Sequence, residues 1–344
     1  MKRYKKASDI TVGVVGYGGA FKMGRVHLEE MHKAGMTPVA VADPDTTCLA
    51  DAEKDFPGIE TYTSLRQMLR KTDVKLVTLI TPHNTHAPLA LEALRAGRHV
   101  VCEKPLAITT AECDRMIAAA KKAGVLLSTY HNRHWDGGIL RALKEIRQRG
   151  RIGDVVRVEC HMGHHARPGD WWRSSKTISG GILYDWGVHL LEYSLQLIDS
   201  DLVEVSGYAK RGFWAPKTAW GDDTIEDEGF AVARFASGQW VTLRISNIET
   251  LPRPGKLEIV GTRGCYIFDE KWWKTVLPRK GGSVTTVGEN PNKQWWRFYG
   301  DIAAHLVKGT KLVITPEWAR RPIHILDLAG KSAEKGRAQK AKYA

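Results

Sequence analysis

A glycine-rich turn directly after a β-branched apolar stretch is the feature that most restricts how this chain can fold. The stretch covers residues 10–15 and leads into Gly16-Tyr17-Gly18-Gly19-Ala20-Phe21-Lys22-Met23-Gly24. In dinucleotide-binding folds the first glycine of such a turn allows a tight bend, and the second lets the backbone approach a pyrophosphate at a helix N-terminus. The third glycine, Gly24, comes three residues later than in the GxGxxG pattern, which predicts an extended loop.

An acidic residue follows the next apolar stretch. Residues 38–42 read as a second strand, and Asp43 comes directly after it. A carboxylate at that place accepts a hydrogen bond from a ribose 2′-hydroxyl and repels a 2′-phosphate. No Arg or Lys follows before Lys54, so the sequence predicts NAD rather than NADP as the cofactor. The alternative is a plain strand–turn–helix in which Asp43 caps a turn.

Short strands alternate with helices over the first 130 residues, which predicts crossover units on a parallel sheet. A capping box, Thr109 with Glu112, starts one of these helices and Gly124 ends it. The predicted strands are 10–15, 38–42, 74–80, 99–102 and 125–130, and the other predicted helices are 25–33, 65–70 and 88–96.

The composition changes near residue 130. All twelve tryptophans lie after residue 134, and longer alternating stretches follow at 155–160, 202–209, 229–235, 239–246 and 256–261. Such alternation is typical of an antiparallel sheet with one covered face. The last segment, 303–338, is predicted to be helical and interrupted by Pro316 and Pro322. We expect an α/β chain with a dinucleotide-binding domain over 1–130 and a second α/β domain over 131–344, whose last helix can return to the first.

Composition and charge exclude several classes of protein. The 344 residues are 43% apolar and 26% charged, which is an ordinary globular mix, and no apolar run is long enough to span a bilayer. We expect no signal peptide. The five cysteines form no CxxC pair, which argues against a zinc knuckle or a disulfide framework and favours the cytoplasm. The net charge of +13 is concentrated at the two basic ends, which we interpret as solvated tails rather than a nucleic-acid site.

Two further segments carry groups able to perform chemistry. Thr81-Pro82-His83-Asn84-Thr85-His86 and Glu103-Lys104-Pro105 each follow a predicted strand, where ligands bind in open α/β sheets. Lys104 can donate a hydrogen bond to a reacting oxygen there, although a lone strand-end lysine is usually an exposed charge. Asp185 and His189 lie one helical turn apart after Gly180-Gly181, a spacing that suits proton transfer but also an ordinary surface pair.

Taken together, these motifs resemble the Gfo/Idh/MocA family, the relatives of glucose–fructose oxidoreductase and inositol dehydrogenase. The resemblance rests on Glu103-Lys104-Pro105, on the Thr81–His86 segment, and on the Gly-Gly-x-x-x-Asp-x-Gly-x-His pattern that ends at His189. It extends to Tyr130-His131-Asn132-Arg133 and to the closing segment 315–332. It implies a Rossmann domain followed by an α/β domain with a large, mostly antiparallel sheet. That sheet commonly forms the oligomer interface, so a homodimer or homotetramer is expected.

The resemblance also implies roles for individual residues. Lys104 is expected to hydrogen-bond the hydroxyl being oxidised, His189 to act as the general acid/base, and Asp185 to orient the substrate or His189. The extended glycine loop departs from the family pattern and puts the phosphate contacts in doubt. The expected cofactor-binding residues are Gly16, Tyr17, Gly18, Gly19, Ala20, Phe21, Asp43, Thr81, Pro82, Asn84, His86, Glu103, Lys104, Asn132, Trp172 and Arg173. The expected substrate-binding residues are Lys104, Arg133, His164, Trp172, Asp185 and His189.

The expected function is that of an NAD-dependent dehydrogenase acting on a sugar, a sugar derivative or an inositol. Sugars stack on aromatic rings, and Trp172 and Trp214 are candidates for that contact, although most tryptophans belong to protein cores. His161, His164 and His165 could suggest a metal, but no further ligand follows at a suitable spacing, so none is expected. One alternative is a redox-neutral lyase or glycosidase that oxidises a sugar carbon transiently. The other is a sensor without catalytic activity.

Overall fold

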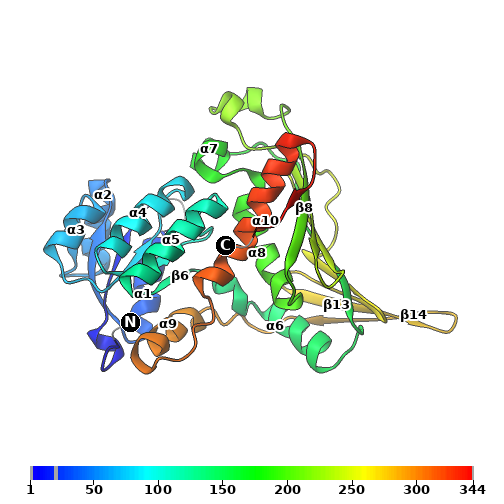
Figure 1. The fold of residues 1–344 in the computed structure, drawn as a ribbon, viewed down its shortest axis with the longest axis horizontal. Coiled ribbons are helices and arrows are strands. Elements are labelled where there is room, and N and C mark those ends of the chain that lie inside the picture. Colours follow the sequence, from blue (N-terminus) through cyan, green and yellow to red (C-terminus); the bar gives the residue numbers. More distant parts are fainter. Residues whose placement is uncertain (1–2, 19–21, 343–344) are drawn as a thin grey trace. The chain divides into compact units, whose positions relative to one another are not determined.

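The computed structural model describes residues 3–18 and 22–342 (Figure 1), so the predicted cofactor residues Gly19, Ala20 and Phe21 lie outside the described residues. The chain divides into two compact units. One comprises Met1–His131 with Trp296–Arg320, and the other comprises Asn132–Trp295 with Arg321–Ala344. The first unit therefore contains a C-terminal segment besides the predicted 1–130. Among the described residues, no helix is both long and apolar enough to cross a membrane.

The first unit contains a six-stranded parallel sheet in the order β3-β2-β1-β4-β5-β6, which confirms the predicted Rossmann sheet. Its central strands are buried almost throughout, as expected for a sheet covered on both faces. The strands are β1 (Thr11–Val15), β2 (Thr37–Ala42), β3 (Glu60–Tyr62), β4 (Leu76–Leu79), β5 (His99–Cys102) and β6 (Leu127–Thr129).

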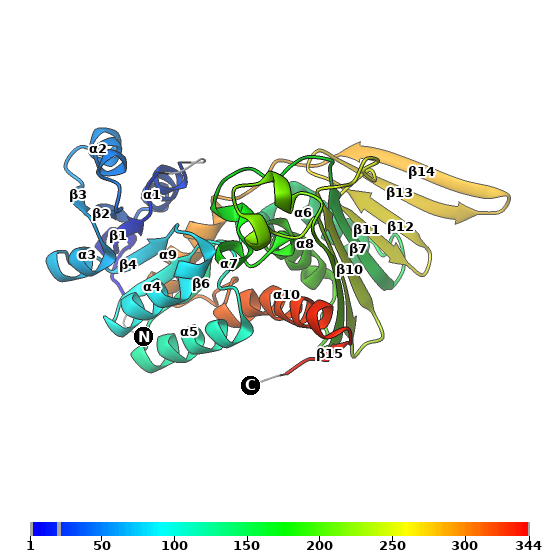
Figure 2. The same ribbon diagram turned by 90° about the horizontal axis from the view of Figure 1, so that it is seen from above.

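Helices cover both faces of this sheet. Figure 2 shows α4 and α5 side by side on one face and α1 on the other. The hydroxyl of Tyr299 in α9 lies 3.3 Å from that of Thr78 in β4, which places α9 against the sheet too. The helices are α1 (Met23–Lys33), α2 (Thr46–Asp55), α3 (Leu65–Lys71), α4 (His83–Arg95), α5 (Thr110–Ala123), α9 (Arg297–Lys308) and α10 (Pro316–Lys335), within which the boundary between the units falls.

Local signals explain several helix boundaries of this unit. The capping box of Thr109 and Glu112 begins α5, and Gly124 ends it at a positive φ of 65°, as predicted. The Asp45 side chain caps α2, a helix that the sequence analysis did not predict. The prediction for α4 was wrong at its start, because the helix begins at His83 and contains Pro88 instead of beginning there.

The second unit contains a nine-stranded sheet in the order β14-β13-β12-β11-β7-β10-β9-β8-β15 (Figure 2). Strands β7 and β10 pair in parallel, and the other neighbouring strands of this sheet pair antiparallel. The mostly antiparallel sheet was predicted, whereas strands β12 to β15 were not. The strands are β7 (Val155–Gly163), β8 (Leu202–Lys210), β9 (Glu228–Phe235), β10 (Trp240–Ser246), β11 (Leu257–Gly261), β12 (Gly264–Phe268), β13 (Trp272–Arg279), β14 (Gly282–Glu289) and β15 (Gln339–Lys340).

One face of this sheet is covered and the other is open. In β10, Val241, Leu243 and Ile245 are buried towards α8, whereas Thr242 and Arg244 alternate with them and are partly exposed. The helices are α6 (Gly137–Leu143), α7 (Lys176–Ser179) and α8 (Ile182–Leu197), with shorter turns at η2 (Asn132–Trp135), η3 (Lys144–Gln148), η4 (Trp172–Ser174), η5 (Ala215–Lys217) and η6 (Gly221–Asp223).

The prediction of a helix over 303–338 needs correction. Two helices occupy this part of the chain, α9 and α10, and residues 309–315 between them are not helical. Gly309 ends α9 at a positive φ of 69°. Pro322 lies inside α10 and does not interrupt it.

Candidate functional site

The predicted cofactor residues of the first unit gather at one edge of its sheet. Gly16 follows β1, Asp43 follows β2, Thr81 comes shortly after β4, and Glu103 follows β5. Because all these strands are parallel, their carboxyl ends meet at the same edge. Strands β1 and β4 are neighbours there although β2 and β3 separate them in sequence, which makes this the switch point where such sheets bind ligands.

In the glycine turn the backbone lies so close to other atoms of the protein that a side chain on any of three glycines would clash with them. Gly16 has a φ of +90°, and a Cβ on it would lie 2.3 Å from the main-chain oxygen of Ile80. A Cβ on Gly18 would lie 2.1 Å from Cys48 Sγ. A Cβ on Gly24 would lie 2.6 Å from Tyr17 Cα, so this late glycine allows α1 to pack closely on the turn. Packing within the protein thus requires glycine at all three positions, and a turn of bare main chain between a strand and a helix is what dinucleotide-binding folds offer a pyrophosphate.

Asp43 holds the glycine turn by hydrogen bonds. Its Oδ2 accepts from the main-chain nitrogen of Tyr17 at 2.7 Å, and its Oδ1 accepts from that of Asp45 at 2.9 Å. The side chain is buried. The carboxylate thus fixes the start of the loop. Its hydrogen bond to a ribose hydroxyl stays a prediction, and the lone pairs that these two contacts leave on its oxygens are available for that bond.

Glu103 belongs to a buried network that the sequence analysis missed. Its Oε1 lies 3.1 Å from His27 Nε2, and His27 Nδ1 lies 2.7 Å from the Tyr299 hydroxyl. Burial raises the pKa of Glu103, but the hydrogen bond and charge of His27, together with the charge of Lys104, outweigh it and hold that pKa below its ordinary value. The carboxylate therefore stays ionised at neutral pH. No local signal could reveal this network, because its members come from α1, from the residue after β5 and from α9.

The same carboxylate positions Lys104. Oε2 of Glu103 accepts a hydrogen bond from the Lys104 main-chain nitrogen at 2.9 Å. The next peptide bond, Lys104–Pro105, is cis. His86 is fully buried next to this peptide bond. Its Nδ1 lies 2.7 Å from the main-chain oxygen of Pro105, and its Nε2 lies 2.9 Å from that of Thr81. His86 thus connects the segment after β4 to the segment that carries Lys104.

The other predicted residues of this unit lie at the start of α4. The hydroxyl of Thr81 accepts a hydrogen bond from that of Thr85 at 2.6 Å. Pro82 precedes the helix, and Asn84 lies in its first turn with its side chain exposed. Asn84 can therefore reach a ligand at the edge of the sheet, and the cofactor contacts of Thr81 and Pro82 stay predictions.

In the second unit, two glycines set the start of α8. Gly180 and Gly181 have φ angles of 94° and 118°, and a Cβ on Gly181 would lie 2.6 Å from Glu226 Oε2. That oxygen accepts from the first main-chain nitrogen of α8, Ile182, at 2.9 Å. Glu226, a residue the sequence analysis missed, therefore caps the helix, and only glycine leaves room for it.

Asp185 and His189 lie one turn apart on α8, as predicted, so they share a helix face. Asp185 is in the first turn and forms an ion pair with Arg173 Nε at 3.4 Å. The Arg173 guanidinium lies over the ring of Trp172 at 4.6 Å. His189 is 6% exposed and its ring lies 5.8 Å from that of Trp186. The structure thus brings Trp172, Arg173 and Asp185 together within this unit.

Three other predicted residues are distributed over this unit. Asn132 is buried at the start of η2. The next residue, Arg133, has its guanidinium 4.6 Å from the Trp186 ring centroid and 3.1 Å from Asp136 Oδ2. His164 is exposed just after β7.

Trp214 is held by the fold. Its Nε1 donates to the Asn247 oxygen at 2.9 Å, and its ring packs against His165. In the described part of the chain, no cluster of three or more His, Cys, Asp or Glu side chains could hold a metal ion.

Two family models match the chain. The Oxidoreductase family, NAD-binding Rossmann fold (GFO_IDH_MocA), matches residues 10–131, and the GFO/IDH/MocA C-terminal domain matches residues 140–267.

Curated relatives match over different lengths. An uncharacterized oxidoreductase of Schizosaccharomyces pombe is 35% identical over 44% of this chain and 42% of its own length. The uncharacterized oxidoreductase YdgJ of Escherichia coli is 33% identical over 56% of this chain and 54% of its own length. The match therefore spans about half of these two proteins. The scyllo-inositol 2-dehydrogenase (NADP(+)) IolW of Bacillus subtilis is 23% identical over 98% of this chain and 97% of its own length.

Solved structures share the whole fold. The oxidoreductase YvaA from Bacillus subtilis superposes with a TM-score of 0.84 at 22% identity and covers 99% of this chain and 100% of its own. GenD2 from gentamicin A biosynthesis, solved in complex with NAD, has a TM-score of 0.74 at 25% identity and covers 100% of this chain and 97% of its own.

Proposed function

Because this chain belongs to the Gfo/Idh/MocA family of oxidoreductases, whose N-terminal domain is an NAD-binding Rossmann fold, we propose that it oxidises a secondary hydroxyl of a sugar, a sugar derivative or an inositol, with NAD as the hydride acceptor. The observation that carries the proposal is the placement of Lys104. It follows β5 at the same sheet edge as the glycine turn, and its main chain is fixed by Glu103. IolW, a relative over nearly the whole length, is named as an inositol dehydrogenase.

In this proposal the residues of the chain supply binding and proton transfer. NAD, when bound, supplies the acceptor of the hydride. The bare backbone of Gly16 and Gly18 receives the pyrophosphate. Lys104 donates a hydrogen bond to the substrate hydroxyl and stabilises the negative charge that develops on its oxygen. His189 removes the hydroxyl proton, a role for which an imidazole is suited near neutral pH.

In this mechanism Arg173 and Asp185 hold other groups in position and transfer neither the proton nor the hydride. The ion pair of 3.4 Å between them fixes the Asp185 carboxylate at the start of α8. That carboxylate then orients the substrate or the nearby His189, and the N-terminal end of the helix favours its negative charge. Trp172 supports the guanidinium of Arg173 from one side.

We propose NAD rather than NADP because Asp43 is a buried carboxylate at the end of β2, where a 2′-phosphate would meet its charge. IolW is named as an NADP(+) enzyme, so the two cofactors have to be compared directly. A kcat/KM at least tenfold higher with NAD is expected, and equal values would contradict the role of Asp43.

We also propose that the open face of the nine-stranded sheet pairs with a second copy of the chain, giving a homodimer or homotetramer. On that face the aromatic rings of Tyr208 and Phe230 lie 6.1 Å apart, and Tyr208 is 63% exposed. Exposed apolar groups of this kind are typical of association surfaces. Light scattering coupled to gel filtration measures the mass, and a monomer would contradict the proposal.

The test of the function follows NADH absorbance with NAD and a panel of sugars, inositols and glycosides, using the full chain and Lys104→Ala. NADH formed with one substrate class, and lost in the variant, is the expected result. Lys75→Ala is a matched control, because Lys75 pairs with Asp73 at the opposite end of β4. Substrate consumption without NADH, with NAD retained on the protein, would instead favour a redox-neutral lyase or glycosidase.

A further inference from the structure

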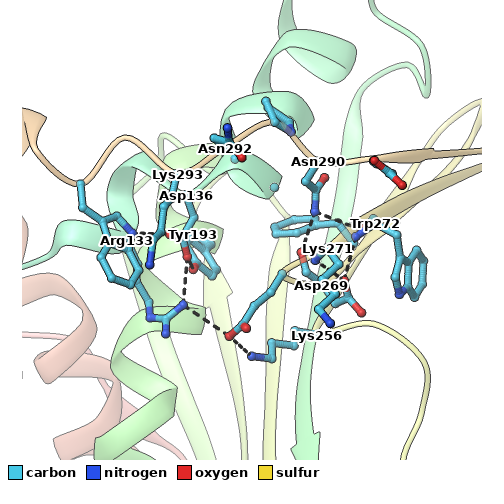
Figure 3. Close-up of a pocket in the computed structure, with 17 residues that line it drawn as sticks. Arg133, Asp136, Tyr193, Lys256, Asp269, Lys271, Trp272, Asn290, Asn292 and Lys293 are labelled. Atoms are coloured by element: carbon cyan, nitrogen blue, oxygen red, sulfur yellow. Dashed lines mark hydrogen bonds and ion pairs between the residues drawn. The ribbon is translucent and has the colours of Figure 1, made fainter. Parts of the chain in front are cut away.

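A groove between α4 and α5 of the first unit has a volume of about 630 Å³, and the residues described along its walls are three basic and four apolar ones. The cavity of the second unit is different, because its walls combine acidic and basic side chains (Figure 3). Glu270, for example, accepts a hydrogen bond there from Lys256 Nζ at 2.6 Å. The charge of the groove in the first unit is thus of one sign, which attracts anionic groups.

Each helix contributes one face to this groove. Helices α4 and α5 lie side by side (Figure 2), and the lining residues recur at the three- and four-residue spacing of a helix face. The main members are Leu91 and Arg95 of α4 and Arg115, Ala118, Ala119 and Lys122 of α5. Most of them are exposed, so the groove lies open on the surface, and its short alanine side chains leave room between the longer basic ones.

The acidic residues of these two helices are engaged elsewhere. Glu92 pairs with Arg66 at 3.2 Å, and Glu112 belongs to the capping box of α5. Asp114 pairs with Arg320 at 2.5 Å. In the part of the chain that the structure describes, none of the three cations of the groove forms an ion pair. Their charges are therefore available to a partner.

The position of Arg115 has no explanation within its own helix. Arg95 and Lys122 lie in the last turns of α4 and α5, where the helix dipole favours a positive charge. Arg115 lies in the middle of α5, far from that end. It is exposed, and it stands beside Ala118 and Ala119 on the face that lines the groove. A partner that brings carboxylates to this face would give Arg115 a role.

The apolar part of the groove distinguishes among anionic partners. Single-stranded nucleic acids stack their bases on aromatic rings, and the described walls carry none. Membrane surfaces are bound by large apolar side chains that enter the lipid, whereas the apolar residues here are three alanines and one leucine. An amphipathic helix fits both features, because small residues let it approach closely and its flanking carboxylates can reach the cations.

We propose that the groove between α4 and α5 is a docking site for an acidic amphipathic helix of another protein. The apolar face of that helix lies along Leu91 and Ala118, and its carboxylates pair with Arg95, Arg115 and Lys122. This surface is separate from the residues assigned to the cofactor and the substrate, so the inference does not depend on the proposed function.

Fluorescence anisotropy of a labelled peptide tests the proposal on the full chain. The probe is an acidic peptide of about 18 residues in which leucine recurs every three or four positions and glutamate flanks it. The wild type should bind this peptide. Arg115→Glu should weaken the binding at least tenfold, because it opposes a carboxylate at the centre of the interface. Ala118→Trp fills the groove without changing the charge, so it should weaken the binding by a similar factor.

Two controls separate docking from general attraction by positive charge. Arg147 is exposed in η3 of the second unit and lies outside the groove. Arg147→Glu should keep the affinity within about twofold of the wild type, because distant charges are screened by salt. A peptide of the same composition in scrambled order keeps its charge but loses its apolar face, so it should bind at least tenfold more weakly.

Several results would overturn the proposal. They are no binding of the acidic helix, equal binding of the scrambled peptide, an unchanged affinity in Ala118→Trp, or an equal loss in Arg147→Glu. Tighter binding of a single-stranded oligonucleotide or of anionic lipid vesicles, lost in Arg115→Glu, would assign the groove to that partner instead. Far-ultraviolet circular dichroism checks that each variant is folded.

Discussion

A methyl group on Gly18 would collide with the side chain of Cys48, and replacing Cys48 by alanine would remove the collision. The ideal Cβ lies 2.1 Å from Cys48 Sγ but 3.3 Å from Cys48 Cβ. In Cys48→Ala the sulfur is gone, and the remaining contact needs a shift of only a few tenths of an ångström. Gly18 therefore has two possible reasons to be glycine, the close sulfur and the approach of a pyrophosphate, and a double-mutant cycle separates them.

The expected magnitudes follow from this geometry. Overpacking of this kind costs about 1–3 kcal/mol, so Gly18→Ala should lower the free energy of unfolding of the first unit by that amount. In the Cys48→Ala background the same substitution should cost less than about 1 kcal/mol, which gives a coupling energy of about 1–2 kcal/mol. Affinity for NAD should fall at least tenfold in both backgrounds, because the second glycine of such a turn is where the main chain approaches the pyrophosphate and a side chain there disturbs that approach.

Urea unfolding followed by circular dichroism measures the stability. Tryptophan fluorescence would report mainly on the other unit, because only Trp296 and Trp318 of the twelve tryptophans lie in this one. Titration calorimetry measures the affinity for NAD. Gly16→Ala is the matched control, since its Cβ would meet the main-chain oxygen of Ile80 at 2.3 Å, which Cys48→Ala cannot relieve. Equal costs of Gly18→Ala in both backgrounds would refute the packing argument, and full recovery of NAD binding in the double variant would refute the pyrophosphate argument.

Three further predictions concern single side chains. His189→Ala should lower kcat by about 10²- to 10⁴-fold, the usual contribution of general-base catalysis, and steady-state kinetics that show no loss would remove His189 from that role. Burial lowers the pKa of His99 to about 4, and its Nδ1 accepts from the Leu126 main-chain nitrogen. The unfolded chain therefore binds more protons between about pH 6.5 and 4, so stability is complete above that window and falls by about 3 kcal/mol across it. Urea unfolding at several pH values should show this fall reduced in His99→Gln. Gly181→Ala forces a side chain to a φ of 118° and towards Glu226, so it should destabilise the second unit by about 1–3 kcal/mol, read from tryptophan fluorescence, whereas Gly238→Ala, at a positive φ in open space, should cost less.

The parallel sheet of the first unit was predictable because its signals are local. Apolar runs of four to six residues, a capping box at Thr109 and a glycine after the last turn of α5 each act within a few residues. Strand β14 was missed because it lacks such a signal. Gly282–Glu289 carries no apolar alternation and is exposed almost throughout where it pairs with β13.

The candidate site was predictable as a set of positions but not as a set of contacts. The motif around Glu103 and Lys104 marks the end of a strand, and the spacing of Asp185 and His189 marks one helix face. The partners come from elsewhere. Arg173 reaches Asp185 from a separate turn, and Glu226 caps α8 from 44 residues downstream of Ile182. Such pairings depend on how the elements pack, which no local pattern encodes.

Glu103 shows why contacts between separate elements matter for the mechanism. The resemblance placed it beside the cofactor, yet one oxygen faces His27 and the other accepts from the Lys104 main chain. Both oxygens are thus used to hold the backbone that presents Lys104, and His27 is itself held by Tyr299. A carboxylate kept ionised by these contacts fixes the main chain at Lys104. Glu103 is therefore part of the frame that holds the main chain at Lys104, and its contact with a cofactor stays a prediction.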